Sequence, residues 1–158
     1  MKEMIKTKEI LAAYNVLNAA KYGSLDDADK IKVWKIARAL KPIAKKFEED
    51  SEDAAKKLKP EMEGGFDEKL MKAQEYEKMV RDPKADMKNL PMGAAEYDAF
   101  IAEFKKYQKL VDDAIKDFAE KDVEVEFEAI EEEAFGKLMA SNEWTIERAV
   151  TLSEIICK

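Results

Sequence analysis

The residues of this chain that could do chemistry are almost all carboxylates. Five of them lie within one stretch of predicted helix: Glu48, Glu49, Asp50, Glu52 and Asp53. Glu49 and Glu52 are three positions apart, so on a helix they face the same way. Two carboxylates on one helix face can hold Mg²⁺ against the phosphates of a nucleotide. Because such pairs arise often in a chain with 35 Asp and Glu residues, we favour a solvated helix face.

Other kinds of catalytic centre have less support in the sequence. The chain contains no histidine, which excludes Ser–His and Cys–His nucleophile pairs and most common transition-metal sites. It also has no glycine-rich dinucleotide fingerprint and no P-loop. Its one cysteine, Cys157, cannot close an internal disulfide, and only Lys158 adjoins it to activate the thiol. We therefore predict no catalytic residue, no metal site and no cofactor.

Two long amphipathic helices are the strongest structural signal. In the first, apolar residues recur at intervals of three and four: Val33, Ile36, Leu40, Ile43 and Phe47, with Trp34, Ala37 and Ala44 widening the stripe. A second such seam lies between Ala94 and Glu120 and is interrupted only by Gln108. These seams predict a long antiparallel, coiled-coil-like helical hairpin. The residues expected to be buried together between the two helices are Leu40, Phe47, Phe104 and Val111.

Shorter helices are predicted around this hairpin. The first begins at an N-cap on Thr7, and the long helix after it begins at a cap on Ser24. An amphipathic segment follows from Phe66 to Val80. Near the C-terminus we expect one helix over Ile130–Ala140 and another from an N-cap at Thr145 to Ile156.

The segment Val123–Glu128 alternates apolar and acidic residues, as a half-buried strand does. A continuous helix from residue 120 to residue 140 is the alternative, but two valines and a phenylalanine favour a strand. Its partner is predicted to be Lys2–Lys6, whose lysines would face the acids. The fold class is therefore mainly α, a single helical domain over residues 1–158 with a small two-stranded β ribbon. The open edges of that ribbon could bind a further strand.

The charge of the chain is unevenly distributed. The net charge is −7, but residues 1–60 carry 14 Lys and Arg against 10 Asp and Glu, so the excess of acids lies later. We expect the halves to pack with complementary faces; an acidic face kept for a basic partner is the alternative. Nucleic acid and membrane are not expected as partners. The charged N-terminus and the lack of a ~20-residue apolar stretch predict a cytoplasmic protein.

The opening segment, Lys6–Asn18, resembles the start of a family of small uncharacterised phage and prophage proteins. Three later elements are similar too: Leu40-Lys41-Pro42, the acidic strand Val123–Glu128 and the helix capped by Thr145. The middle, Glu61–Gly93, does not share this similarity. The resemblance implies a phage-encoded accessory protein, for example in virion or tail assembly, and it transfers no catalytic residue.

We therefore predict a non-enzymatic accessory or assembly protein that acts through protein–protein contacts. Its expected partner is a phage structural or assembly protein, and it would form at most a small homo-oligomer. The alternative is a helical Mg²⁺-dependent nucleotide pyrophosphohydrolase that uses Glu49 and Glu52, although the chain offers no convincing second carboxylate pair of this kind.

Overall fold

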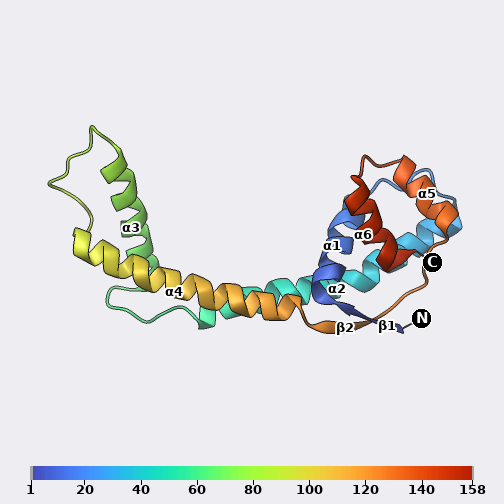
Figure 1. Cartoon of the computed structure of the whole chain (residues 1–158), viewed down its shortest axis with the longest axis horizontal. Helices are drawn as coiled ribbons and strands as arrows, with labels where there is room; N and C mark the ends of the chain where they lie inside the picture. Colours follow the sequence, from blue (N-terminus) through green and yellow to red (C-terminus); the bar gives the residue numbers. More distant parts are fainter. Residues whose placement is uncertain (1, 158) are drawn as a thin grey trace. The chain divides into compact units, whose positions relative to one another are not determined.

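The computed structural model describes residues 2–157, which are mainly α-helical, with six helices and one two-stranded antiparallel sheet (Figure 1). The predicted class is thus confirmed, and 67% of the chain is helical. The elements are β1 (Lys2–Lys6), α1 (Thr7–Asn18), α2 (Asp27–Lys57), α3 (Phe66–Arg81), α4 (Ala94–Ala119), β2 (Asp122–Glu126), α5 (Glu132–Ala140) and α6 (Ile146–Ile156). The chain divides into two compact units. The first contains residues up to Asp50 and from Lys116 onward, and the second contains Ser51–Ile115.

The first unit has an aliphatic core. Helices α1, α5 and α6 gather around the first half of α2 (Figure 1). Seven large side chains in this core are fully buried: Ile10, Ile36, Leu40, Ile130, Leu138, Leu152 and Ile156. The Ile130 N–H donates to the carbonyl of Ile156 at 2.9 Å, which ties the segment before α5 to the end of α6. Burial of these aliphatic groups is the main stabilising contribution to this unit.

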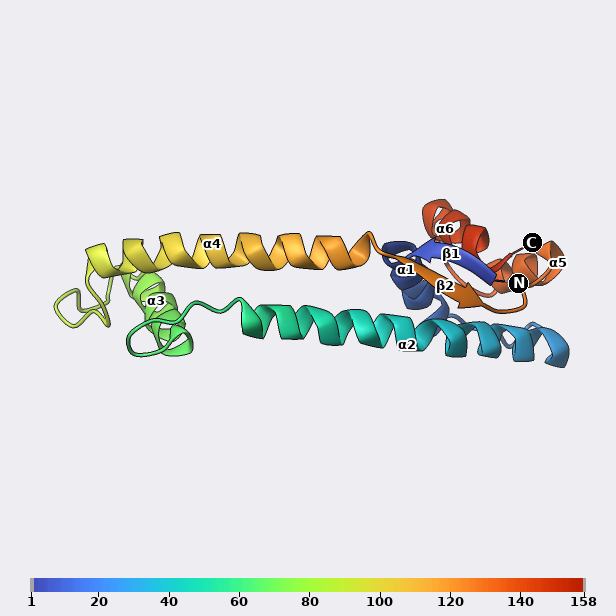
Figure 2. The same cartoon turned by 90° about the horizontal axis from the view of Figure 1, so that it is seen from below.

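The predicted β ribbon is present in the first unit. β1 and β2 pair antiparallel, with Lys2 opposite Glu126 and Lys6 opposite Asp122 (Figure 2). The predicted pairing is confirmed, but β2 ends at Glu126, two residues earlier than expected. The alternative of one helix over residues 120–140 is wrong, because α5 begins only at Glu132. The ribbon is held on the core by the buried side chains of Ile5 and Val125.

Two of the predicted helix caps are wrong. Thr7 is the first residue of α1, and its hydroxyl donates to the carbonyl of Lys121 at 2.9 Å instead of accepting from its own helix. The Glu9 carboxylate accepts from the N–H of Lys6 at 3.2 Å at this helix start. The tertiary partner of the Thr7 hydroxyl therefore overrides its local capping preference.

At the start of α2 the cap is Asp26 and not Ser24. The Asp26 carboxylate accepts from the N–H of Asp29 at 2.8 Å, whereas the Ser24 hydroxyl donates to the carbonyl of Lys137 at 3.1 Å. Both oxygens are good caps, so contact with α5 decides between them. The predicted cap of α6 is confirmed, since the Thr145 hydroxyl accepts from the N–H of Arg148 at 3.2 Å.

The second unit has an aromatic core. Its buried residues are Phe66, Ala73, Met92 and Phe100. The ring centroid of Phe66 lies 5.7 Å from that of Phe100 and 5.0 Å from that of Tyr107. The Tyr107 hydroxyl donates to the carbonyl of Ala55 at 2.7 Å, which connects α4 to the last turns of α2. Ring contacts of this kind add to the free energy of burial.

A second tyrosine joins α3 to α4 in this unit. The Tyr97 hydroxyl donates to the Glu77 carboxylate, and the Tyr97 ring stacks on that of Tyr76 with centroids 4.5 Å apart. The hydrogen bond to Glu77 is the main reason that the pKa of Tyr97 rises to about 12. The contact therefore persists throughout the neutral range.

The predicted shared burial of the two helical seams is wrong. Leu40 is fully buried in the core of the first unit, whereas Phe104 packs against the core of the second. Phe47 and Val111 are only partly buried. Trp34, expected to widen the buried stripe, is 56% exposed. The spacing located apolar faces on both helices, but Leu40 and Phe104 pack in different cores and part of the first seam remains uncovered.

Candidate functional site

Two of the five carboxylates singled out from the sequence form ion pairs on the surface of α2. Glu49 lies 3.9 Å from the ammonium group of Lys45, and Asp50 lies 2.7 Å from that of Lys46. Glu52 is exposed. Within residues 2–157, no group of three or more acidic, His or Cys side chains could hold a metal ion. The arrangement is that of a solvated helix surface with pairs at i, i+4.

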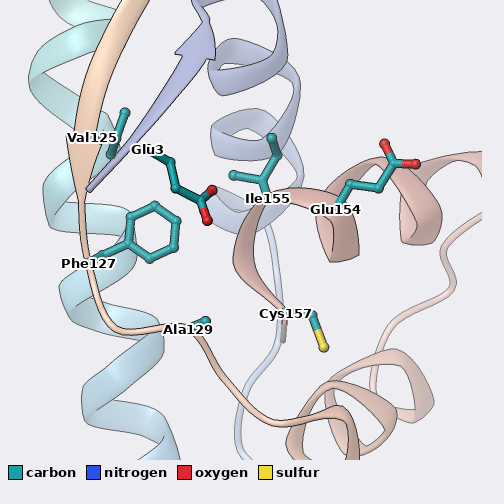
Figure 3. A pocket seen from close by; sticks show the side chains of 7 residues that line it. All are labelled: Glu3, Val125, Phe127, Ala129, Glu154, Ile155 and Cys157. Atoms are coloured by element: carbon teal, nitrogen blue, oxygen red, sulfur yellow. The ribbon is translucent and has the colours of Figure 1, made fainter. Parts of the chain in front are cut away.

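Cys157 lines a small, partly open cavity in the first unit. Figure 3 shows this cavity, of about 60 Å³, and its lining side chains Glu3, Val125, Phe127, Ala129, Glu154, Ile155 and Cys157. Small-molecule sites usually measure about 300–1,000 Å³, so this space suits a few waters rather than a ligand. The backbone of Cys157 bridges to Ile130 beside it. Its position therefore contributes to the closure of the core.

A larger groove lies beside β2 in the same unit, with a volume of about 440 Å³. Its apolar lining comes from α2 and from the chain on either side of the end of α4: Pro42, Ile43, Phe47, Phe118 and Val123. This volume is within the range of natural binding sites. We call it the β2 groove.

The β2 groove lies beside the first three residues of β2. Asp122, Val123 and Glu124 all line it, although successive strand side chains point to opposite faces. No residue of β1 lines it. β2 pairs only with β1 in the described chain, so the N–H and C=O groups on its other side have no strand partner. An apolar groove and an open strand edge therefore lie together.

An ion-pair cluster fixes the chain that leads into β2. The Glu120 carboxylate accepts from the ammonium groups of Lys8 at 2.6 Å and Lys6 at 3.0 Å. These hydrogen bonds lower the pKa of Glu120 to about 2, and the same contact raises the pKa of Lys6. The N–H of Thr7 also donates to the carbonyl of Lys121 at 2.9 Å. These contacts hold the end of α4 against β1 and α1.

Sequence reasoning anticipated the open edges of the ribbon but missed the groove. The heptad spacing predicts that Ile43 and Phe47 lie in the buried seam, yet both are only partly buried and line the groove. Residues 42–50 and 118–124 form its walls, and they are far apart in the sequence. No local spacing connects two such segments. The sequence offered only an apolar seam in the first long helix and a separate alternating segment, without a pattern that relates the two.

Comparison with protein-family models, with curated proteins and with solved structures gives no match. No helix within residues 2–157 is both long and apolar enough to cross a membrane.

Proposed function

We propose that this chain is a non-enzymatic interaction protein that binds an extended segment of a partner protein along the outer edge of β2. The observation that supports this is the β2 groove, where an apolar hollow of about 440 Å³ adjoins an open strand edge. A third strand would pair its backbone with β2 and place alternate side chains in the hollow. Main-chain hydrogen bonds would supply affinity, and the hollow would supply specificity.

The charges beside the edge indicate the chemistry of the partner segment. Asp122, Glu124 and Glu126 are exposed and share one face of β2. On this face β1 already places Lys6 opposite Asp122 and Lys2 opposite Glu126. A third strand with basic residues on the same face would complement these acids. The partner segment therefore alternates apolar and basic residues.

The setting of this role follows from the resemblance to phage and prophage proteins. We propose a cytoplasmic accessory or assembly protein whose partner is a phage structural or assembly protein. The finding most informative for this setting would be the genes that flank the coding sequence.

Strand addition is tested with a synthetic peptide of alternating valine and lysine, about six residues long, a common strand length. We expect it to slow amide hydrogen exchange in β2, at residues 122–126. A valine–glutamate peptide of equal length should not protect these amides, because it opposes acid to acid. Phe47→Ala should weaken the protection, whereas Leu110→Ala, at a 53% exposed position in the second unit, should not. Equal protection by both peptides, or no effect of Phe47→Ala, would contradict strand addition.

The enzymatic alternative has its own assay. The protein is incubated with Mg²⁺ or Mn²⁺ and a panel of nucleoside triphosphates, and release of pyrophosphate or phosphate is measured. We expect no turnover above that of the Glu49→Gln/Glu52→Gln variant. Turnover that this variant abolishes would assign catalysis to the carboxylate pair and overturn the proposal.

A further inference from the structure

The first part of α2 is rich in positive charge, although the chain as a whole is acidic. Between Lys30 and Phe47 there are seven Lys and Arg residues and no Asp or Glu. Acids bracket this stretch, with Asp27 and Asp29 before it and Glu48 after it. The positive charge is therefore confined to about 24 Å of helix, at about 1.5 Å of rise per residue.

Part of this stretch forms one exposed face. Five exposed residues follow one another at intervals of three, one, three and three, and we call them the basic face: Ile31, Trp34, Lys35, Arg38 and Lys41. Val33, Ile36 and Leu40, on the other side of the helix, are buried in the core of the first unit. The helix is thus anchored on one side and open on the other.

The centre of the basic face combines an apolar and a cationic surface. Trp34 is 56% exposed and Ile31 is 53% exposed. The guanidinium group of Arg38 lies 5.2 Å from the centroid of the Trp34 ring, in cation–π contact. Trp and Arg are the residues most enriched at the energetic centres of protein interfaces.

The charges of the basic face are not neutralised within the described chain. Lys32, which points away from this face, pairs with Glu128 at 3.3 Å, and Lys46 pairs with Asp50 at 2.7 Å. No carboxylate among residues 2–157 forms an ion pair with Lys35, Arg38 or Lys41. These cations are therefore available to an external partner.

An apolar depression adjoins the basic face, between α1 and α2. It measures about 480 Å³, and Leu11, Tyr14 and Ala44 supply part of its lining. Its charged lining is Lys41, which belongs to the basic face, together with Lys45 and Glu48. A partner that contacts the cations can thus insert an apolar side chain next to them.

From these observations we infer that the basic face of α2 is a second docking surface, which binds an acidic segment of a partner protein that also carries apolar residues. Charge complementarity selects an acidic partner. Duplex nucleic acid fits less well, since its outward-facing phosphate backbone offers nothing apolar to Ile31 or to the depression. A flat anionic membrane would extend over Glu48 and Glu49, which are exposed at the end of the stretch, whereas a peptide can place its acids on the basic face and only an apolar side chain beside Glu48. The basic face requires a partner of opposite charge to the one proposed for strand addition at β2, and the two hollows share one lining residue, Phe47.

Tryptophan fluorescence provides a direct assay. The chain has two tryptophans, and Trp144 packs against Phe135 with centroids 6.2 Å apart, so Trp144→Phe leaves Trp34 as the only reporter. The probe is an amphipathic glutamate–leucine peptide about four helical turns long. We expect it to shift Trp34 emission to the blue in a saturable way. Its affinity should fall about tenfold or more between about 0.05 M and 0.5 M salt.

Matched charge variants identify the surface that responds. Lys35→Glu/Lys41→Glu should weaken binding about tenfold or more, because it opposes like charges at the contact. Lys105→Glu/Lys109→Glu makes the same change in net charge at two exposed positions of α4, and affinity should stay within about threefold. Circular dichroism of both variants verifies that helicity is retained.

Parallel titrations with oligothymidylate and with phosphatidylserine vesicles decide between partner classes. The inference requires that the glutamate–leucine peptide bind more tightly than either, and more tightly than a polyglutamate peptide of equal length. Tighter binding of the oligonucleotide or the vesicles would overturn it. No saturable shift with the peptide, or equal losses in the two charge variants, would overturn it as well.

Discussion

The two units of this chain are stabilised by different kinds of core. In the first unit all seven large, fully buried side chains are aliphatic, and they come from α1, α2, α5 and α6 and from the segment before α5. In the second unit only four residues are buried, and the contacts among Phe66, Phe100 and Tyr107 predominate. The first core therefore joins distant segments, whereas the second forms between neighbouring ones.

This difference has consequences for stability and folding. The second unit is one continuous stretch, Ser51–Ile115, so its contacts close shorter loops than those that join the two ends of the chain in the first unit. The first unit must bring residues from both ends of the chain together, so we expect it to fold more slowly than the second unit. Its core, however, contains more buried apolar residues than the core of the second unit. Both proposed docking surfaces lie on the first unit. We therefore expect the second unit to unfold more readily, with the binding surfaces intact.

The largest expected effect comes from removing the central ring of the second unit. Phe66→Ala should cost about 3–5 kcal/mol, because Phe66 contacts Phe100, Phe104 and Tyr107. Near-ultraviolet circular dichroism of the tyrosines should show the loss. Trp34 and Trp144 both lie in the first unit, so their emission should be unchanged. A parallel loss of tryptophan signal would show that the two units unfold together, and it would contradict the expectation that the second unit unfolds more readily.

A deletion in the aliphatic core should affect the other unit. Leu138 is fully buried, and Leu138→Ala should lower the free energy of unfolding by about 2–5 kcal/mol through the lost burial and the cavity left behind. Urea unfolding followed by tryptophan emission measures it. Leu110→Ala removes the same group at a 53% exposed site and should change stability by less than about 0.5 kcal/mol. Similar costs at both sites would contradict the assigned core.

The smallest expected effect concerns the ion-pair cluster around Glu120. Its folded-state pKa, about 2, lies below the ordinary value of 4.5, so its contribution to stability is complete above pH 4.5 and disappears as the pH falls towards 2. Glu120→Gln should therefore be less stable than the wild-type protein at pH 6 and no less stable near pH 2. Urea unfolding across this range measures the difference. Glu143→Gln, which removes an exposed carboxylate elsewhere in the first unit, should not show this convergence.

Much of the secondary structure was predictable from local patterns. The seam from Val33 to Phe47 predicted α2, and alternation in Val123–Glu128 predicted β2, because each period is set by backbone geometry alone. The cap at Thr145 was predictable because the hydroxyl accepts from an N–H only three residues further along the chain. The caps of α1 and α2 were not, since the hydroxyl groups of Thr7 and Ser24 bond to Lys121 and Lys137, residues far away in the sequence.

By itself, then, the sequence determined which face of each helix is apolar and which two segments pair as strands. Only the tertiary structure decided what covers those faces. It buried Leu40 in the first unit and packed Phe104 against the core of the second. It left Trp34 exposed among cations and opened a groove along β2. The physical reason is that burial is non-directional: periodicity shows that a face must be covered, but the partner is chosen by the packing of the whole chain.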